Sequence, residues 1–546
     1  MLLQDIYVHP SADLLGRDVM DALPRLAPVR FISCPNLAER SRNDVVVSLS
    51  GSEEALVEIS KAGFRAFHVT SKNPGARSES QGEPVRFGKT EHVDKLFRRR
   101  TIPHQVVANL TALQVQADDE VLARSGEQPV WIRRQLPSSA VYIVSAPLPK
   151  LVDEEKPFDY LNGYHFIQLL PLLHFLREVT VGMGWTRPPL RACFTFDDPN
   201  LHWSSYGFLS YRELIERARR DRFHVAFATV PLDAWGSNAS TVNLFKENPG
   251  QISLLVHGNN HTREELGQAR TPDGHLRLLA QSLRRVEKLE RATGLQVDRV
   301  MVPPHEALVD GALTALLSLG FEGVSLTPWS LRYWNPKREW PCTFGLESAE
   351  LIDGGCPMLS RYKLSASCDG PIVMSAYLGA PIVLIEHHEA VAGGLDLLTR
   401  AASVINSLGD VQWCSTGEML RSNYLTRREN GTLWVKPFSA RVEFRVPQDV
   451  SSVALAASGG AQHAGKSDFL IVPKRRGMKS AAIQAVAGVP FHVGPGETVE
   501  LVSSALGKVD HRQFESAALP VAALSRRILC ETRDRLAALK PRARRA

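Results

Sequence analysis

Two short segments, about sixty residues apart, carry side chains that suit metal chemistry. The first is an apolar run that ends in adjacent carboxylates, Asp197 and Asp198. The second is an apolar run that leads into two imidazoles four residues apart, His257 and His261. Neutral imidazoles together with a carboxylate form the mixed nitrogen and oxygen donor set of zinc and similar divalent metals. The two segments together predict a metal site.

Both segments read as strand ends, and α/β enzymes place their chemistry at the carboxyl ends of strands. Adjacent strand residues point in opposite directions, so the two carboxylates can take different roles. If the segment from His257 turns into a helix, His261 lies on the same face. Each feature also has an ordinary explanation, because Asp is a preferred helix cap and a histidine pair is often polar packing. Their conjunction favours a metal-assisted hydrolase of an amide or ester.

With these motifs the chain resembles the polysaccharide deacetylases, which are family 4 carbohydrate esterases with a distorted (β/α) barrel. The resemblance covers about residues 188–425. The family's Thr-Phe-Asp-Asp-Gly motif is matched by Thr195-Phe-Asp-Asp198, and its His-x-x-x-His motif by His257 and His261. It implies that Asp197 is the general base and that Asp198, His257 and His261 bind Zn²⁺ or another divalent metal such as Co²⁺, Ni²⁺ or Mn²⁺.

The family also has a late motif, an apolar strand that ends in a catalytic histidine. The segment Pro381-Ile-Val-Leu-Ile-Glu-His387-His388 resembles it. The resemblance implies that one of the two histidines is the general acid that protonates the leaving group. His387 is the preferred candidate, with His388 as the alternative. Exposed histidines at a strand end are also ordinary in proteins.

The chain departs from the family pattern at two places. Pro199 follows the aspartate pair where the family has glycine, and the segment that carries the family's base-orienting arginine reads Val-Pro-Pro-His305-Glu306 here. His305 and Glu306 could orient Asp197 or reach the metal or substrate, or could simply form a turn. After Pro199, the aromatic residues Trp203 and Tyr206 are candidates for a sugar-binding wall, although packing under a loop is more common for such rings.

The elements around these residues alternate between strand and helix. Apolar positions at helical spacing predict helices over 211–220, 281–290 and 312–320, with strands over 225–230, 299–303 and 323–326. Alternation of this kind is typical of a parallel barrel or a doubly wound sheet. We therefore expect an α/β fold in which a distorted (β/α) barrel positions the candidate site.

The length of 546 residues predicts several domains. We expect an α/β domain over 1–150, a linker helix over 151–187, the deacetylase-like barrel over 188–428, a β-sandwich over 429–515, and a solvated basic helical tail over 516–546. The first domain resembles flavodoxin-like, glutamine-amidotransferase-like accessory domains. Its Cys34 would be the nucleophile if the domain were active, but no partner histidine is evident, so we predict a noncatalytic domain. The sandwich either binds carbohydrate or packs on the barrel.

Charge and cysteine usage narrow the cellular setting. The net charge of +6 comes largely from the basic tail, and no patch of interleaved basic and aromatic residues indicates nucleic-acid binding. We expect no transmembrane segment and no secretory signal. Seven widely spaced cysteines fit reduced thiols better than a disulfide framework, which predicts a cytoplasmic protein. The oligomeric state is not indicated.

The leading hypothesis is a metal-dependent hydrolase that deacetylates an N- or O-acetylated amino sugar or polysaccharide. The main alternative is a noncatalytic carbohydrate-binding or polysaccharide-assembly protein that retains the barrel, because the motif glycine and the orienting arginine are missing. A further alternative is a metal-independent glycoside hydrolase that uses two carboxylates, Asp197 with Glu306 or Glu386.

Overall fold

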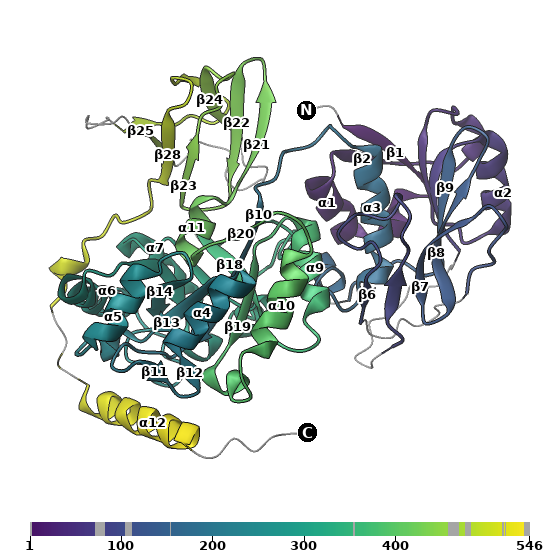
Figure 1. Ribbon diagram of the computed structural model, residues 1–546. Coiled ribbons are helices and arrows are strands. Elements are labelled where there is room, and N and C mark those ends of the chain that lie inside the picture. The colour runs from purple at the N-terminus through teal and green to yellow at the C-terminus, as the bar shows by residue number, and fades with distance from the viewer. Residues whose placement is uncertain are drawn as a thin grey trace. The chain divides into compact units, whose positions relative to one another are not determined.

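The computed structural model describes residues 3–70, 82–103, 112–152, 154–352, 355–456, 469–474, 482–515, 518 and 520–539. They form two compact units (Figure 1). The first unit contains Met1–Gly184, Trp340–Glu347 and Ser367–Leu378, and the second contains Trp185–Glu339, Ser348–Ala366 and Gly379–Ala546. Among the described helices, none is long and apolar enough to cross a bilayer.

A nine-stranded sheet forms the centre of the first unit. Five parallel strands are ordered β2 (Val29–Ser33), β1 (Gln4–His9), β3 (Val45–Ser48), β4 (Arg65–Val69) and β9 (Ala140–Val144). Four strands continue the sheet in antiparallel pairs, namely β8 (Gln128–Gln135), β7 (Glu120–Ser125), β5 (Val85–Phe87) and β6 (Thr101–Ile102). The helices of this unit are α1 (Arg17–Leu26), α2 (Glu53–Ala62), α3 (Leu170–Val179) and α9 (Asp369–Leu378). Helix α3 lies in the segment 151–187 that was expected to link two domains.

Cys34 follows strand β2 and is 3% exposed. Burial raises the pKa of its thiol, which donates a hydrogen bond to the carbonyl of Asn36. The nearby ring of His9 lies 2.9 Å from the backbone oxygen of Cys34, not from its sulfur. The thiolate, which is the nucleophilic form, is therefore disfavoured at this position.

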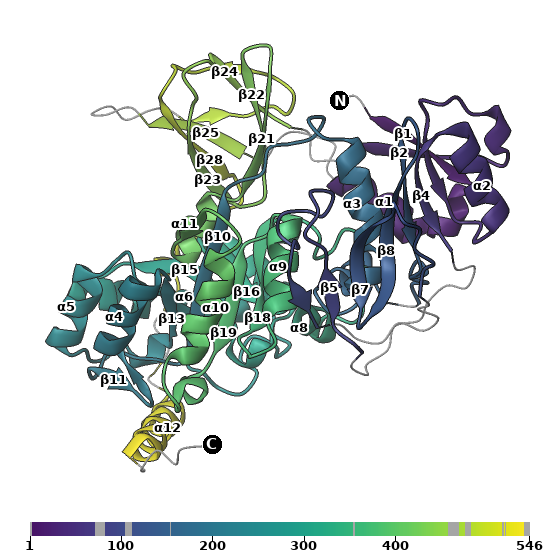
Figure 2. The ribbon, with the colours of Figure 1, turned by 45° about the vertical axis from the view of Figure 1, so that its right-hand side comes forward.

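A closed parallel barrel of seven strands forms the core of the second unit, which confirms the barrel that the alternating pattern predicts (Figure 2). The strands follow one another as β13 (Val225–Thr229), β14 (Ile252–His257), β15 (Val297–Val302), β16 (Gly323–Leu326), β18 (Cys356–Lys363), β19 (Ile382–Glu386) and β10 (Leu190–Asp197). Pairing of β10 with β13 closes the barrel. Strand β20 (Val411–Trp413) adds beside β10, and β17 (Glu350–Ile352) pairs antiparallel with β18.

Helices follow the strands and lie on the outside of the barrel (Figure 1). They are α4 (Tyr211–Asp221), α5 (Ala239–Glu247), α6 (Pro272–Thr293), α7 (Asp310–Leu319), α8 (Pro328–Trp334), α10 (Asp396–Asn406) and α11 (Thr416–Arg421). In α6 the buried residues Leu279, Leu283 and Val286 recur at helical spacing. The helix begins after the side-chain cap of Thr271 and ends at Gly294, whose φ of 69° suits glycine.

Short elements occupy the loops at the carboxyl ends of the barrel strands. The hairpin of β11 (Ser205–Tyr206) and β12 (Leu209–Ser210) follows β10, and three short 3₁₀ helices are η5 (Pro231–Asp233), η6 (Pro304–Glu306) and η7 (His388–Val391). They follow β13, β15 and β19. Residues that could do chemistry therefore meet at one edge of the barrel.

After the barrel come two four-stranded sheets. One contains β21 (Tyr424–Glu429), β22 (Thr432–Pro437), β24 (Ser452–Leu455) and β27 (Phe491–His492), and the other contains β23 (Arg441–Arg445), β28 (Thr498–Ser503), β25 (Phe469–Lys474) and β26 (Ile483–Gln484). Buried residues of both sheets, such as Val435, Val442 and Val499, share one hydrophobic core. Strand β21 begins at Tyr424, a few residues before the expected boundary.

The last element is helix α12 (Val521–Leu539). The basic composition of this segment led us to expect a solvated tail, but Arg527 and Asp534 are 6% and 5% exposed. Their partners lie in the barrel loops, far away in the sequence. Figure 2 shows α12 beside β11, which it contacts.

Candidate metal and catalytic site

The two adjacent aspartates at the end of β10 have different surroundings. The residue Asp197 is 3% exposed and lies opposite Ala228 in the neighbouring strand. The next residue, Asp198, has left the strand, with its φ at 84° and its backbone N–H bonded to the carbonyl of Ala228. Its side chain is 20% exposed. The sequence therefore gives one buried and one partly open carboxylate at the same strand end.

Arg361 of β18 holds the buried carboxylate. Its two terminal nitrogens each lie 3.0 Å from an oxygen of Asp197, and its Nε lies 2.9 Å from Glu306. Burial would raise the pKa of Asp197, but the positive charge of Arg361, with a contribution from His257, outweighs it and holds that pKa below its usual value. Asp197 is therefore ionised at neutral pH and fixed in orientation by a bidentate pair.

His257 ends strand β14 and is 2% exposed. Its Nδ1 lies 2.9 Å from the carbonyl oxygen of Val302, which can only accept a hydrogen bond. The ring therefore carries its proton on Nδ1, and the lone pair of Nε2 is left for another partner. Burial lowers the pKa of His257, so the ring is neutral near pH 7. A carbonyl that fixes the tautomer in this way is the usual support of a metal-binding histidine.

His261 lies in the loop after β14, and the helix considered for this segment does not begin until Pro272. The loop turns at Gly258, whose φ is 62° and whose position leaves no room for a Cβ beside Pro304. Buried Glu265 then accepts the backbone N–H groups of Asn259 and Asn260, at 2.8 and 2.9 Å. These bonds, not a helical turn, bring the second imidazole back towards the first.

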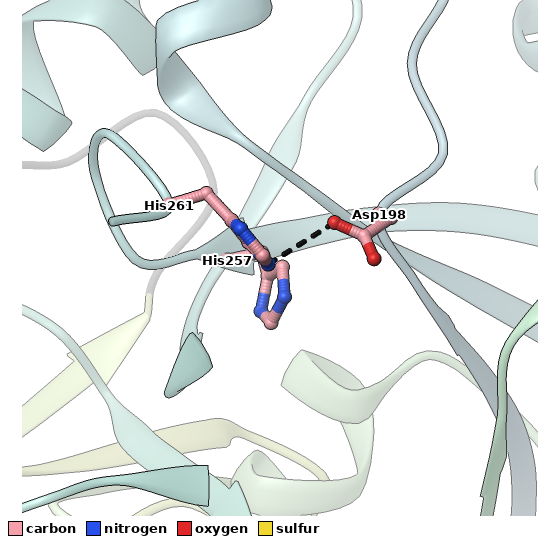
Figure 3. A group of neighbouring side chains, drawn as sticks. All are labelled: Asp198, His257 and His261. Carbon is pink, nitrogen blue, oxygen red and sulfur yellow. Dashed lines mark ion pairs between the residues drawn. The ribbon is translucent and has the colours of Figure 1, made fainter. Parts of the chain in front are cut away.

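The ligand atoms of Asp198, His257 and His261 lie within 4.8 Å of one another (Figure 3). The His261 Nε2 lies 3.1 Å from an oxygen of Asp198, and the two imidazole ring centres are 4.9 Å apart. Burial lowers the pKa of His261 to about 3, and the proximity of His261 together with the positive charge of Arg527 holds the pKa of Asp198 well below its usual range. Two neutral imidazoles and a carboxylate fit a divalent ion of the zinc type.

Backbone strain gathers at the same place. Asp198, His261, His305 and Glu306 all have positive φ, between 54° and 84°. Residues other than glycine rarely adopt this conformation, and each instance costs roughly 1–3 kcal/mol. Strain of this kind persists where the surrounding structure enforces it, which is most common at functional sites.

The two adjacent histidines after β19 face different ways. His387 is exposed, and its charge lowers the pKa of both Asp197 and Asp198. His388 is 4% exposed and packs against the ring of Tyr206, with its Nε2 3.4 Å from Asp534 of α12. Of the two histidines, His387 is the one open to solvent, whereas His388 is engaged by Tyr206 and Asp534.

The residues of η6 contribute unequally. Glu306 accepts hydrogen bonds from Thr327 at 2.5 Å and Ser330 at 2.7 Å, besides its pair with Arg361. One oxygen of Glu306 therefore pairs with Arg361, and the other is held by the two hydroxyl groups. His305 is exposed, and its ring centre lies 5.2 Å from that of His261.

The two aromatic candidates are placed in contrasting ways. Tyr206 is 1% exposed, and its hydroxyl donates to Asp534 at 3.5 Å. Trp203 is 55% exposed, with the guanidinium of Arg535 4.9 Å from its ring centre. Trp203 could still stack on a ligand, whereas Tyr206 is packed beneath α12.

Three site residues were not found from the sequence. Arg361 lies in the apolar run of β18. A charged residue within such a run is buried, so the sequence could have indicated that Arg361 needs a buried acidic partner. In the sequence, only the position of Glu265 shortly after the histidine motif could have indicated that it belongs to the site. Arg527 of α12 donates to Asp198 at 2.9 Å and to Asp233 at 2.6 Å. It was read as one basic residue of a solvated tail.

No family model matches the chain, and no curated protein does. Several solved structures do, among them a proposed polysaccharide deacetylase from Mycobacterium smegmatis at 17% identity (43% of this chain, 91% of that one, TM-score 0.31). A family 4 carbohydrate esterase from Streptomyces lividans in complex with acetate matches at 14% identity (42% and 93%, TM-score 0.26). A family 4 acetyl xylan esterase from Clostridium thermocellum with a cobalt ion matches at 13% identity (42% and 89%, TM-score 0.26).

The resemblance expected from the motifs is thus found again among solved structures. It is distant and partial. At these identities and TM-scores, the activity, the substrate and the roles of residues have to be argued from the chain itself.

Proposed function

We propose that this protein is a metal-dependent hydrolase that removes an acetyl group from an acetylated amino sugar or polysaccharide. The observation that carries the proposal is the convergence of two sets of residues at one edge of the barrel. One set is the ion pair of Asp197 and Arg361, and the other is the group of Asp198, His257 and His261. Hydrolysis by this mechanism needs both sets, one to supply the base and the other to hold the metal.

Asp198, His257 and His261 would hold the divalent metal. Such an ion, when bound, polarises the substrate carbonyl and lowers the pKa of water towards neutrality. The carbonyl of Val302 keeps His257 in the tautomer that presents Nε2, and the loop bonds of Glu265 keep His261 facing it. These contacts therefore keep the two imidazoles in place without a metal.

Asp197 acts as the general base that takes the proton of the attacking water. It is ionised because Arg361 lowers its pKa, and it lies next in sequence to the metal ligand Asp198. Arg361 acts as a positioning residue, because two parallel hydrogen bonds fix both oxygens of the carboxylate. A base held in a defined orientation is required for efficient proton transfer.

His387 protonates the leaving amine or alcohol. Its exposure and its electrostatic influence on both aspartates support this role, whereas His388 is occupied by Tyr206 and Asp534. The acetylated carbohydrate as substrate rests on the motif resemblance alone, and Trp203 is the exposed aromatic side chain that could stack on a sugar ring.

Specific contacts argue against each of the two alternative functions. The noncatalytic alternative rested on the missing arginine partner of the base, and Arg361 supplies such a partner from another strand. The two-carboxylate hydrolase, in the form that pairs Asp197 with Glu306, needs that second carboxyl group free to transfer a proton. Glu306 is engaged by Arg361, Thr327 and Ser330, and both it and Asp197 share one guanidinium.

The test compares metal content and acetate release in three variants. Asp197→Asn should keep about one divalent ion per chain and lose acetate release from acetylated amino-sugar oligomers by about a hundredfold or more. The double variant His257→Ala/His261→Ala should lose the ion and the activity together. Asp396→Asn, at a side chain that is 92% exposed, is the matched control and should change neither. Wild type that binds no ion from a metal-replete buffer, or full activity in Asp197→Asn, would refute the mechanism.

A further inference from the structure

Helix α12 docks on the barrel through charged residues that share one face. Arg527, Glu531, Asp534 and Arg535 follow one another at spacings of four, three and one, which place them along one side of a helix. Every one of them contacts a loop at the carboxyl edge of the barrel. The helix that composition assigns to a solvated tail is therefore held specifically against the candidate site.

The guanidinium of Arg527 reaches the metal ligand itself. One terminal nitrogen lies 2.9 Å from Oδ1 of Asp198, and the other lies 3.1 Å from its backbone oxygen and 2.6 Å from Asp233. Burial would lower the pKa of Arg527, but the two carboxylates outweigh it and raise that pKa. Arg527 is therefore a buried, permanently charged cation at Asp198.

Arg527 contacts the carboxylate oxygen of Asp198 that lies nearest to His261. Oδ1 of Asp198 is also the atom that faces Nε2 of His261 at 3.1 Å, on the side where an ion would sit. A divalent ion bound there would lie beside a buried guanidinium, and charges of equal sign repel strongly where water is excluded. The contact of Arg527 with Asp198 and metal binding are therefore opposed.

The rest of the helix covers the loop after β10. Glu531 accepts a hydrogen bond from Asn200 at 3.0 Å and pairs with His202 at 3.3 Å. Arg535 stacks on Trp203. These loop residues flank the aspartate pair and include the aromatic ring that could contact a sugar. The docked helix thus takes up part of the surface beside the aspartate pair, while Trp203 remains 55% exposed.

The helix is held mainly by polar contacts, with little apolar burial. Its apolar contribution to a core is Ala523, with Leu524 partly buried, against Val230 and Leu232. Larger apolar side chains of the helix face solvent, with Leu529 70% exposed. An element with few buried apolar contacts opens at low free-energy cost.

We propose that α12 is an intramolecular inhibitory helix in which Arg527 takes the place of the metal's positive charge at Asp198. Metal loading and substrate entry then require the helix to leave the site. The inference rests on the proposed metal site. In this proposal helix α12 regulates metal binding and activity of the hydrolase within the same chain.

The test is a zinc titration of the full-length chain by calorimetry, with Arg527→Gln compared with wild type. Removing the competing cation should tighten zinc binding by about tenfold or more, because less of the protein is held in a binding-incompetent state. Arg291→Gln, which removes the same charge from an exposed arginine of α6 that pairs with Glu287, is the matched control and should change the affinity by less than about twofold. His388, Glu389 and Asp534 also bring three possible ligands together, so His257→Ala/His261→Ala is titrated in parallel to subtract zinc bound there.

The outcomes separate this inference from the proposed function. Unchanged or weaker zinc binding in Arg527→Gln overturns the inference while the metal site stands, and weaker binding identifies Arg527 as a support that orients Asp198. Absence of site-specific zinc in both proteins overturns the metal site and the inference together. As a second measurement, zinc should increase amide exchange across residues 521–539 of the wild type, and unchanged exchange in zinc-bound protein contradicts displacement of the helix.

Discussion

Replacement of Arg361 by methionine tests the centre of the site. Arg361 is fully buried, and both oxygens of Asp197 lie 3.0 Å from its nitrogens. Opposite charges about 4 Å apart attract by about 4 kcal/mol at an effective dielectric constant of about 20. Breaking a buried pair by removing one partner costs about 3–5 kcal/mol, because the other charge is left without compensation. Arg361→Met should therefore destabilise the barrel by about 4 kcal/mol.

The assay must report on the barrel alone, since a chain with two compact units need not unfold in one step. Hydrogen exchange of peptides from β10 and β18, followed by mass spectrometry, gives the free energy of opening of these strands. Removing the stranded charge of Asp197 with Asp197→Asn in the Arg361→Met background should recover about half of the loss or more, the remainder coming from Glu306, which also loses its partner. Arg291→Met removes an exposed pair with Glu287 and should cost less than about 0.5 kcal/mol.

A decrease in the free energy of opening of less than about 1 kcal/mol in Arg361→Met would refute the reasoning. Such a small decrease would mean that another side chain or water compensates the charge of Asp197. Failure of Asp197→Asn to recover stability would point to lost packing of the arginine stem, not to a stranded charge. Zinc binding by the double variant shows whether the metal ligands kept their arrangement through both changes.

Further outcomes concern the acid, the loop and the first unit. His387→Ala should lower kcat by about a hundredfold or more, whereas His388→Ala should mainly loosen α12; equal kinetic losses in steady-state assays would contradict the assignment. Gly258→Ala should weaken zinc affinity, because φ is 62° and the added Cβ would come within 2.4 Å of Pro304; a calorimetric titration that matches wild type would show that the loop adapts. Burial lowers the pKa of His68 to about 4, so the folded unit binds fewer protons than the unfolded chain between about pH 6.5 and 4. The free energy of unfolding of the first unit should therefore fall as the pH drops through that window, by up to about 3 kcal/mol. In His68→Gln this pH dependence should be weaker, and denaturant titrations followed by hydrogen exchange of the first unit measure it.

The parts of the site that the sequence predicted are local in the chain. Asp197 and Asp198 come at the end of one apolar strand, and the two imidazoles come at the end of another and just after it. The order of residues alone therefore predicts that these four side chains lie at strand ends. The helix considered after His257 was wrong, because Gly258 turns the chain and Glu265 takes its amide groups. That outcome depends on a side chain eight residues along, not on periodicity.

The missed residues act over long sequence separations. Arg361 meets Asp197 across 164 residues, and Arg527 meets Asp198 across 329. Composition describes the end of the chain correctly as basic, yet composition carries no information on which carboxylates one arginine will meet. The barrel itself was predictable because each strand and helix repeats the same local pattern, and burial on one helix face needs no distant partner.

The origin of Arg361 in β18 has a consequence for how such sites are recognised. A search that reads motifs in order along a sequence expects the arginine in the segment after β15, finds His305 and Glu306 there, and counts the residue as lost. In space the guanidinium of Arg361 reaches Asp197, the proposed base, from a strand two places further around the barrel. An arginine supplied to a carboxylate by another strand is invisible to a search that follows motif order, and only the arrangement of charges in space reveals it.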